Sequence, residues 1–429
     1  MKKFNAIDYL DSLNANVMHF GLARVGDALD RLGRPHLDYP AVLIAGTNGK
    51  GSTAAMLAAM LSAAGYKTGL YTSPHLVDVR ERIVIDGRKI SAGDFNDLVF
   101  RVRRAARLPL TYFEVLTAAA YLHFSRQRVD IAVLEVGLGG RLDATNVCRP
   151  LVSVITNIAL EHTAWLGKTL SAIAREKAGI IRKDGLCLTA ATQKKVLYVL
   201  ETVCREKNAG LRILGVDFHV RADQDGRLTY RGSLGSLRGL EISLSGDHQR
   251  KNAALALAAL EAVTASGFVA PEAAIRRGLK KTRWAGRGEI LCPKPLFVLD
   301  GAHNPAGVRA LCRSLGKQYA FDRLILIFAA LADKDYPSML ARIAPEAHRI
   351  YLPRLSVSRA VSPEHLADVL RSMKKKPVIV ETTGQAMKQA FARAGRGDLI
   401  VAAGSLYLAG DIKQTFSQMH LCGKAKRAK

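Results

Sequence analysis

The residues most able to do chemistry lie in the stretch G-T-N-G-K-G-S, residues 46–52, between a short apolar run and an alanine-rich helical pattern. A glycine loop between a strand and a helix presents backbone N–H groups and the positive helix end to a phosphate. The ammonium of Lys50 would pair with the β- and γ-phosphates. The loop departs from the usual G-x-x-x-x-G-K-[ST] pattern because a glycine separates the lysine from the hydroxyl residue. The sequence therefore predicts a nucleotide site at Asn48, Gly49, Lys50, Gly51 and Ser52.

A phosphate loop needs a magnesium partner, and Glu135 is the strongest candidate. It ends the apolar run I-A-V-L-E, and an acid at the carboxyl tip of a buried strand lies where parallel sheets bind ligands. A glutamate that merely meets solvent at a strand end would give the same pattern. The loop V-G-L-G-G-R-L-D-A-T-N follows at once, with three glycines, Arg141, Asp143 and Asn146. Loops this rich in glycine and polar groups usually hold a ligand, which favours a role in the site for Glu135.

The elements that must position these residues follow an alternating pattern. Apolar runs of strand length alternate with helical patterns, and the alternation restarts after Trp284. Such alternation predicts parallel sheets covered by helices. Residues 211–245 interrupt it as polar, turn-rich, short antiparallel strands, and helices follow over 249–266 and 271–280. We expect two α/β units joined near residues 282–288.

Composition limits the possible function classes. The chain has 429 residues, of which 49% are apolar and 23% charged, as in a soluble globular protein of two or three domains. It has no run of 18 or more apolar residues, and its start lacks the apolar run of a secretion signal. We therefore expect a cytoplasmic protein that makes no membrane contact. The six cysteines show no C-x-x-C pair and are expected to be reduced core thiols.

The net charge of +26 is unusual for a chain of this composition. It fits nucleic-acid binding, a field that attracts anionic substrates, or simply a solvated basic surface. The basic residues are spread along the chain, and no basic stripe is interleaved with aromatic residues. We therefore expect small anionic substrates and no nucleic acid as partners.

Eleven motifs, taken in order, make the resemblance to one family specific. They are AGTNGKGS (45–52), TSPHL (72–76), TYFE (111–114), LEVGLGGRLDATN (134–146), ITNIALEHTAWLG (155–167), EKAGII (176–181), SGDHQRKNAALA (245–256), WAGRGEI (284–290), LDGAHNPAG (299–307), LADKD (331–335) and GSLYLAGD (404–411). The chain resembles the folylpolyglutamate synthases, especially the bifunctional bacterial kind that is also a dihydrofolate synthase. These enzymes are ATP-dependent Mur-type amide ligases.

The resemblance implies an α/β fold with two domains. Residues 1–284 would form a Mur-ligase-like, P-loop ATPase domain that binds ATP and pterin, with a mostly parallel sheet. Residues 285–429 would form a Rossmann-like glutamate-ligase domain. The chain would act as a monomer, with a site closed between the two domains to exclude water from the intermediate.

The implied chemistry is amide formation through an acyl phosphate. ATP phosphorylates a carboxylate, and the amine of L-glutamate attacks it; the acceptors are dihydropteroate and reduced folates. Two Mg²⁺ ions and a carbamylated Lys177 are implied. The implied catalytic residues are Lys50, Glu135, His162 and Lys177. The implied metal ligands are Ser73, Glu135, His162 and Lys177 as its carbamate. The implied pterin contacts are Thr111, Tyr112, Phe113, Glu114, Leu142, Asp143 and Ala144. The further implied ATP contacts are Asn252, Arg287, Asp300 and His303.

Without the resemblance, these residues have plainer interpretations. Lys177 reads as a solvated helix lysine, His162 as a structural histidine and Phe113 as core. Asn252 reads as a polar residue in the first turn of a helix, and Asp300 as an ordinary strand-end acid.

The chain also departs from the family, with Glu161 where an aspartate is usual and W-A-G-R where W-P-G-R is usual. Other functions stay open: a monofunctional folylpolyglutamate synthase, a cell-wall Mur ligase, a cyanophycin-type ligase, or a basic nucleic-acid-binding ATPase.

Overall fold

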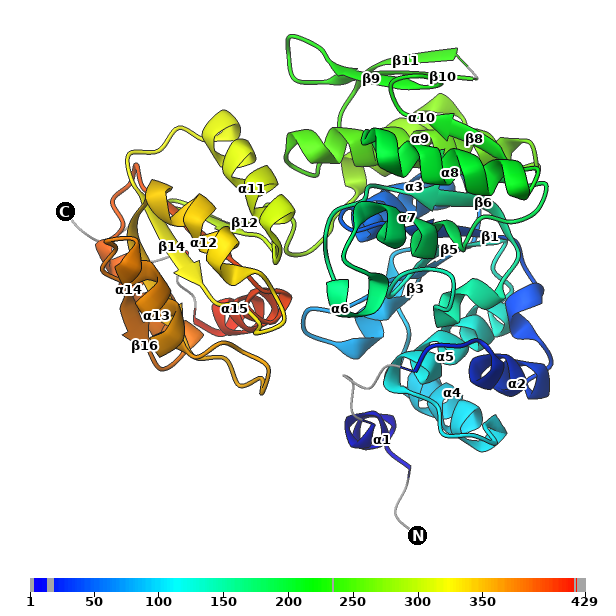
Figure 1. Ribbon diagram of the computed structural model, residues 1–429, viewed down its shortest axis with the longest axis horizontal. Helices are drawn as coiled ribbons and strands as arrows, with labels where there is room; N and C mark the ends of the chain where they lie inside the picture. Colours follow the sequence, from blue (N-terminus) through cyan, green and yellow to red (C-terminus); the bar gives the residue numbers. More distant parts are fainter. Residues whose placement is uncertain (1–3, 14–18, 234, 420–421, 423–429) are drawn as a thin grey trace. The chain divides into compact units, whose positions relative to one another are not determined.

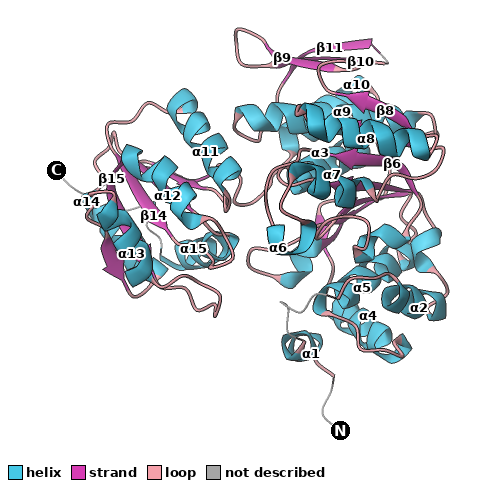
Figure 2. Cartoon of the chain, viewed as in Figure 1, coloured by secondary structure: helices cyan, strands magenta, loops and turns pink. Residues whose placement is uncertain are grey.

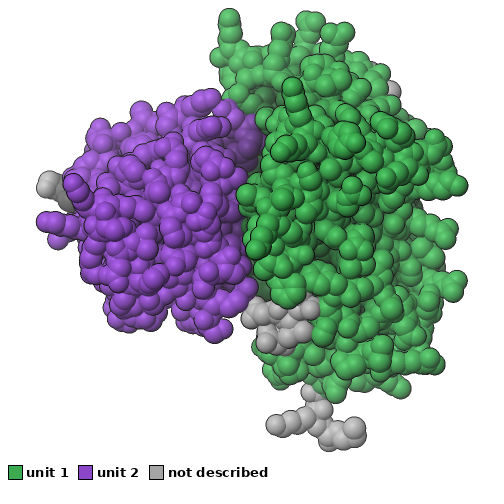
Figure 3. Space-filling model, in the orientation of Figure 1, with its two compact units in different colours: residues 1–243, 249–283 green, residues 244–248, 284–429 purple. Residues whose placement is uncertain are grey.

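The computed structural model describes residues 4–13, 19–233, 235–419 and 422. The chain divides into two compact units, coloured separately in Figure 3. Unit 1 comprises residues 1–243 and 249–283, and unit 2 comprises residues 244–248 and 284–429. The sequence predicts one boundary, after residue 284, which leaves the short segment 244–248 in the first domain. In the structure this segment groups with unit 2. Among the described residues, no helix is both long enough and apolar enough to span a bilayer.

Unit 1 is built on an eight-stranded sheet in the order β4-β3-β2-β5-β1-β6-β7-β8. Figure 1 labels its strands β1, β3, β5, β6 and β8. Its strands are β1 Ala41–Ala45, β2 Thr68–Tyr71, β3 Ile83–Ile85, β4 Arg88–Lys89, β5 Ile131–Glu135, β6 Pro150–Ile155, β7 Leu186–Thr189 and β8 Gly210–Ile213. The six strands from β2 to β8 in this order are parallel, and β3 and β4 add an antiparallel edge. The central strands β1 and β5 are buried at every position, which explains their unbroken apolar sequence.

Helices cover this sheet. They are α1 Ala6–Ser12, α2 Ala23–Arg31, α3 Lys50–Ala63, α4 Ala92–Ala105, α5 Tyr112–Arg126, α6 Thr163–Leu166, α7 Leu170–Ala178, α8 Lys194–Glu206, α9 Asp247–Thr264 and α10 Glu272–Lys281, with 3-10 turns η1 Pro35–Leu37, η2 Val79–Arg82 and η3 Ala144–Val147. The helix α3 that follows the phosphate loop is buried nearly all round, because α10 packs against it. The approach is so close that a Cβ at Gly278 would lie 2.6 Å from the Cα of Met60.

The polar stretch forms a separate antiparallel sheet, as the sequence predicts. Its strands are β9 His219–Ala222, β10 Leu228–Gly232 and β11 Gly235–Leu240, in the order β11-β10-β9. One part of that prediction is wrong: residues 210–213 form β8, which pairs parallel with β7 in the main sheet. The start of the stretch therefore still belongs to the α/β alternation.

Unit 2 has a six-stranded sheet in the order β12-β13-β17-β14-β15-β16. Figure 2 shows two of its strands, β14 and β15, with helices beside them. Its strands are β12 Glu289–Pro293, β13 Leu296–Leu299, β14 Leu324–Phe328, β15 Ala347–Pro353, β16 Val378–Val380 and β17 Leu399–Ala403, and its helices are α11 Pro305–Gln318, α12 Tyr336–Ile343, α13 Pro363–Ser372, α14 Thr383–Arg393 and α15 Leu406–Met419, with the turn η4 Ala344–Glu346. Among the described strands of this sheet, the edge strand β12 pairs antiparallel with β13, and the other pairs are parallel. The predicted α/β fold with mostly parallel sheets is confirmed.

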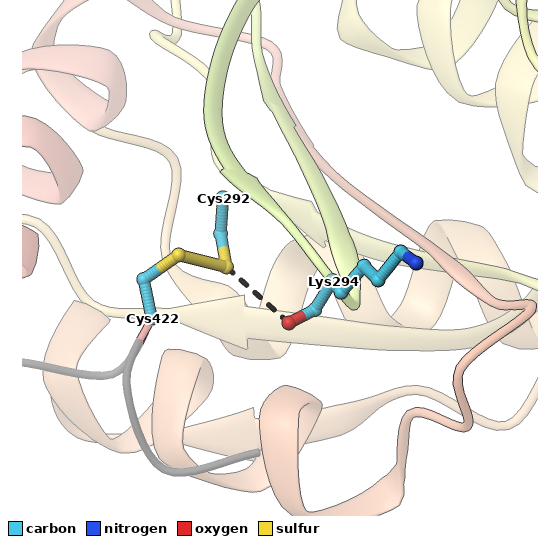
Figure 4. Close-up of a disulfide and its surroundings, with 3 residues drawn as sticks. All are labelled: Cys292, Lys294 and Cys422. Carbon is cyan, nitrogen blue, oxygen red and sulfur yellow. Dashed lines mark hydrogen bonds between the residues drawn. A yellow bond between two sulfur atoms is a disulfide. The ribbon is translucent and has the colours of Figure 1, made fainter. Parts of the chain in front are cut away.

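Two of the six cysteines contradict the expectation of reduced thiols. Cys292 in β12 and Cys422, beyond α15, form a disulfide whose Cα atoms are 5.6 Å apart (Figure 4). The two residues are 130 positions apart, so their spacing along the chain gives no hint of the pairing. The other four, Cys148, Cys187, Cys204 and Cys312, are free and buried, as expected.

Candidate active site

Four neighbouring strands of unit 1 bring several of the candidate residues to one edge of the sheet. The strands β2, β5, β1 and β6 lie side by side and run parallel, so their carboxyl ends share that edge. Ser73 follows β2, Glu135 ends β5, the phosphate loop follows β1, and His162 follows β6. This is the edge at which α/β sheets bind their ligands.

The glycines of the phosphate loop are required by the protein's own packing. Gly46 and Gly49 have φ values of 144° and 88°, which a residue with a Cβ rarely adopts. A Cβ on Gly46 would overlap the hydroxyl of Thr156, and one on Gly49 would overlap the amide of Asn252. The loop is therefore pressed between the segment after β6 and helix α9.

The segment after β6 fixes the loop by hydrogen bonds, a role that the sequence did not reveal. The Nδ2 of Asn157 donates to the Asn48 carbonyl (2.7 Å), and its Oδ1 accepts from the Asn48 N–H (3.0 Å). The Thr156 hydroxyl donates to the same carbonyl (2.7 Å). The backbone at Asn48 is thus held before any ligand arrives, which reduces the ordering cost of binding.

Lys50 and Glu135 face each other at the edge. The Lys50 Nζ lies 4.0 Å from the Glu135 Oε1 and donates to the Thr47 carbonyl (3.3 Å). The Glu135 Oε2 accepts the backbone N–H of Ser73 (3.0 Å). The Glu135 side chain is only 6% exposed. The structure thus joins the ends of β2, β5 and β1 through one carboxylate.

Lys177 is buried, which contradicts its plain interpretation as a solvated helix lysine. It lies on α7 and is 5% exposed, and its Nζ donates to the carbonyl of Gly46 in the phosphate loop (3.0 Å). Burial, helped by the nearby charge of Lys50, lowers the pKa of this ammonium from 10.5 to about 7. The amine is therefore substantially neutral at physiological pH, beside a phosphate site.

His162 is the N-cap residue of α6, with a left-handed backbone (φ 51°), and it is partly buried, next to Glu161. No three His, Cys, Asp or Glu side chains gather as a metal-binding group in the part of the chain that the structure describes. A metal at this edge would therefore need ligands of other types beside Glu135 and His162. A serine oxygen and a modified lysine are such ligands.

A buried amide connects the phosphate loop to α9. The Nε2 of Gln249, which is 1% exposed, lies 3.3 Å from the Ser52 hydroxyl, and its Oε1 accepts from the Asn252 Nδ2 (2.9 Å). Gln249 was missed from the sequence, although it stands in the same H-Q-R-K-N motif as Asn252. Asn252 is more than a polar residue in a first helical turn, because it also packs against Gly49.

Part of the TYFE motif has a structural role. Thr111 is the N-cap of α5 and accepts the Glu114 N–H (3.2 Å), while Glu114 accepts the Thr111 N–H (2.8 Å). This is a capping box, and the T-x-x-E spacing that signals one is visible in the sequence. The buried Glu114 also pairs with Arg24 (3.3 Å). Phe113 is half-buried, and its ring lies where a Cβ on Gly137 would be.

The loop after β5 closes on itself around Asp143. This buried carboxylate accepts the N–H groups of Leu138 (2.8 Å) and Thr145 (3.0 Å). Burial raises the pKa of Asp143, and these hydrogen bonds oppose the rise. The loop is pinned to the end of α7 by the Arg141–Glu176 ion pair (2.9 Å). Leu142 and Ala144 flank Asp143 on this fixed backbone.

The candidate residues of unit 2 lie around the carboxyl end of β13. Asp300 is buried, and its two oxygens accept the N–H groups of Gly288 and Ala302, each at 2.8 Å. The Nδ1 of His303 lies 2.8 Å from the Gly301 carbonyl. Arg287 precedes Gly288 in the turn that Asp300 holds.

Two family models match the chain. The Mur ligase middle domain matches residues 44–260, and the glutamate ligase domain of Mur ligases matches residues 286–406. The dihydrofolate synthase/folylpolyglutamate synthase of Bacillus subtilis is 35% identical over 92% of this chain and 94% of its own length. A Haloferax volcanii protein named a probable bifunctional folylpolyglutamate synthase/dihydropteroate synthase is 36% identical. The chain spans about half the length of that relative (51%).

Solved structures agree with these matches. The Escherichia coli protein FolC in complex with DHPP and ADP superimposes with a TM-score of 0.90 at 33% identity, covering 96% of this chain and 97% of its own. A bifunctional folylpolyglutamate synthase/dihydrofolate synthase with Mn, AMPPNP and L-glutamate bound gives 0.88 at 31% identity, with 96% and 98% coverage.

Proposed function

Since the chain belongs to the Mur ligase family, among its dihydrofolate synthases/folylpolyglutamate synthases, we propose that it adds L-glutamate to dihydropteroate and to reduced folates with ATP. The observation that carries this proposal is the edge of the unit 1 sheet, where Lys50 faces Glu135 beside the buried Lys177. Both reactions convert a carboxylate into an acyl phosphate and then into an amide, with ADP and phosphate as the other products. Such chemistry needs positioning and charge neutralisation more than covalent help from the protein.

The phosphate loop supplies the neutralising charge. The fixed backbone of residues 46–52 and the start of α3 bind the phosphates of ATP, and Lys50 balances the charge that develops on the transferred phosphoryl group. Ser52 supports the same group from within the helix start, held by Gln249. Asn252, Arg287, Asp300 and His303 are proposed contacts of the nucleotide, on the basis of the family motifs.

The donor set at the edge fits Mg²⁺. A hard divalent ion takes carboxylate and hydroxyl oxygens, and Glu135 and Ser73 offer these from adjacent strands, with His162 on the loop after β6. Bound there, magnesium would supply positive charge that neutralises phosphate oxygens. We propose that Ser73, Glu135 and His162 are metal ligands and that the enzyme binds two Mg²⁺ ions. The Mn in a related structure supports a divalent metal.

The same electrostatics support a carbamate on Lys177. Two ammonium groups, Lys50 and Lys177, already lie close enough for one to lower the pKa of the other. A divalent cation beside them binds more favourably when Lys177 carries no positive charge. A carbamate turns Lys177 into an anionic oxygen ligand, and the lowered pKa supplies the neutral amine that must react with CO₂. Incubation with ¹³C-bicarbonate, magnesium and ADP should give a protein-bound carbamate signal that is absent from Lys177→Met.

The acceptor is proposed to lie along the start of α5 and the loop after β5, with Tyr112 and Phe113 beside the pterin. Thr111, Glu114 and Asp143 shape this surface through the capping box and the closed loop, with Leu142 and Ala144 on the backbone that Asp143 holds. Because the folate acceptor is longer by one glutamyl unit, one reaction centre can serve both acceptors only if the pterin takes two positions.

The direct test is mass spectrometry of the products formed from ATP and glutamate with dihydropteroate or with tetrahydrofolate. We expect dihydrofolate from the first and extended polyglutamates from the second. Extension of tetrahydrofolate without dihydrofolate formation would leave a monofunctional enzyme, as the name of a Lacticaseibacillus casei relative, 35% identical, implies for that protein. No product from either acceptor would refute the proposed function.

A further inference from the structure

Arg82 is a buried charged residue of unit 1 that the proposed reaction centre does not use. It ends the turn η2, just before β3, and is only 8% exposed. Its Nε donates to the His75 Nδ1 (2.9 Å), and its guanidinium carbon lies 5.4 Å from the centre of the Tyr112 ring. Both contacts are to uncharged groups, a hydrogen-bonding ring nitrogen and an aromatic face. Neither balances the charge of the guanidinium.

No carboxylate among the described residues lies within ion-pair distance of Arg82. The two acids on its own turn are already occupied. Asp78 pairs with Arg80 (2.7 Å) and Lys89 (3.2 Å). Glu81 accepts backbone N–H groups from the preceding loop, including that of Leu76 (2.9 Å). Arginine is rarely buried to this degree without an anionic partner, because losing water around the charge is costly. The balancing charge is therefore expected from a ligand.

The surroundings of Arg82 indicate the acceptor as that ligand. It joins the TSPHL motif to Tyr112, the aromatic residue proposed to lie beside the pterin. Within the described residues it makes no hydrogen bond or ion pair with the phosphate loop, Glu135 or Lys177. The group that Arg82 neutralises is therefore on the acceptor, and it is distinct from the carboxylate that meets ATP.

The two proposed acceptors differ in such a group. Dihydropteroate has one carboxylate, and that carboxylate reacts. A folate acceptor ends in a glutamyl unit with two carboxylates, of which one reacts and the other stays charged. We propose that Arg82 binds this non-reacting carboxylate, whose geometry suits the paired N–H donors of a guanidinium. The inference rests on the proposed function and assigns to Arg82 the selection of folate acceptors over dihydropteroate.

The test compares Arg82→Gln and Arg82→Lys with Arg80→Gln, a matched control on the same turn whose side chain is 33% exposed and pairs with Asp78. Loss of a buried charge partner usually costs a binding step about 30-fold or more. We expect Arg82→Gln to raise the KM for tetrahydrofolate by at least that factor. The KM of Arg82→Lys should lie between those of the wild type and Arg82→Gln. The KM values for dihydropteroate and glutamate should stay within about threefold, as should all values of the control.

A substrate change gives the complementary evidence. We replace the non-reacting carboxylate of tetrahydrofolate by a primary amide. For the wild-type chain this amide should raise the KM about as much as Arg82→Gln raises the KM for tetrahydrofolate itself. Combining the variant with the amide should raise the KM little further. Dihydropteroate turnover by the same preparation shows that the variant is folded.

Three results would overturn the assignment. They are an equal loss on both acceptors, a raised KM for glutamate, and no loss on tetrahydrofolate. A wild-type chain that extends neither acceptor would refute the proposed function and this inference with it. A wild-type chain that uses only dihydropteroate would refute this inference and the polyglutamylating half of the proposed function, whereas the three results above would refute this inference alone.

Discussion

The carboxyl edges of the two parallel sheets carry similar sequences and use their acids differently. In each unit an apolar strand leads into a buried carboxylate, Glu135 at the end of β5 and Asp300 after β13. The oxygens of Asp300 accept two backbone N–H groups from neighbouring loops. Glu135 accepts one backbone N–H group, from Ser73, and its other oxygen lies 4.0 Å from the ammonium of Lys50. An acid held by two backbone N–H groups shapes a loop, whereas an acid that also faces a lysine side chain takes part in a charge cluster.

The largest expected effect tests that cluster. Lys50→Ala should lower the rate of ligation by about 10²–10³-fold or more, because it removes the main charge that stabilises the transferred phosphoryl group. Turnover is measured with saturating ATP on protein whose circular dichroism matches the wild type. The control is Lys195→Ala, at an exposed position on α8. Near-normal turnover by the folded Lys50 variant would show that the loop does not act on ATP.

Glu135→Gln should have the next largest effect, on the metal. The amide keeps the shape but lacks the charge, so we expect the magnesium concentration for half-maximal activity to rise at least about tenfold. His162→Ala should shift the same titration. Binding of dihydropteroate, measured by calorimetry, should change less than the metal dependence in both variants. A wild-type magnesium titration in either variant would remove that residue from the proposed ligand set.

The difference between the two edges also explains what the sequence could and could not predict. The phosphate loop and Glu135 follow from local pattern, because a strand, a loop and a helix start are adjacent in the chain. The burial of Lys177 does not follow from local pattern, since its hydrogen bond joins it to Gly46, 131 residues away in the chain. The same holds for Arg82, whose unusual feature is its lack of an acidic partner among the described residues. The capping box of Thr111 and Glu114 could have been recognised from its spacing.

A smaller effect is expected from Lys177 in protein free of metal and bicarbonate. Its folded pKa of about 7 lies below the ordinary 10.5, so from pH 7 to 10.5 the unfolded chain binds more protons. Burying this lysine therefore destabilises the fold most below pH 7, and the cost is relieved as the pH rises toward 10.5. Lys177→Met should be more stable than the wild type at pH 6, by a margin that shrinks above pH 7. Parallel pH profiles of the melting temperatures would contradict the lowered pKa.

The smallest effect on catalysis is expected from Asp300→Asn, which tests the other edge. The amide keeps one acceptor oxygen but presents an NH₂ group to one of the two backbone N–H donors, Gly288 or Ala302. Leaving such a buried donor unsatisfied costs about 1–3 kcal/mol of folding stability. For a unit of this size each kcal/mol lowers the melting temperature by about 2–4 °C.

The effect of this substitution on ATP should be indirect. Asp300 holds the turn that contains Arg287, so loosening that turn should raise the KM for ATP less than about tenfold. The magnesium titration should be unchanged, in contrast to Glu135→Gln. A shifted magnesium titration with an unaltered melting temperature would mean that Asp300 acts on the metal, as Glu135 is proposed to do. In that case, hydrogen bonds from backbone N–H groups would not distinguish an acid that shapes a loop from an acid of the charge cluster.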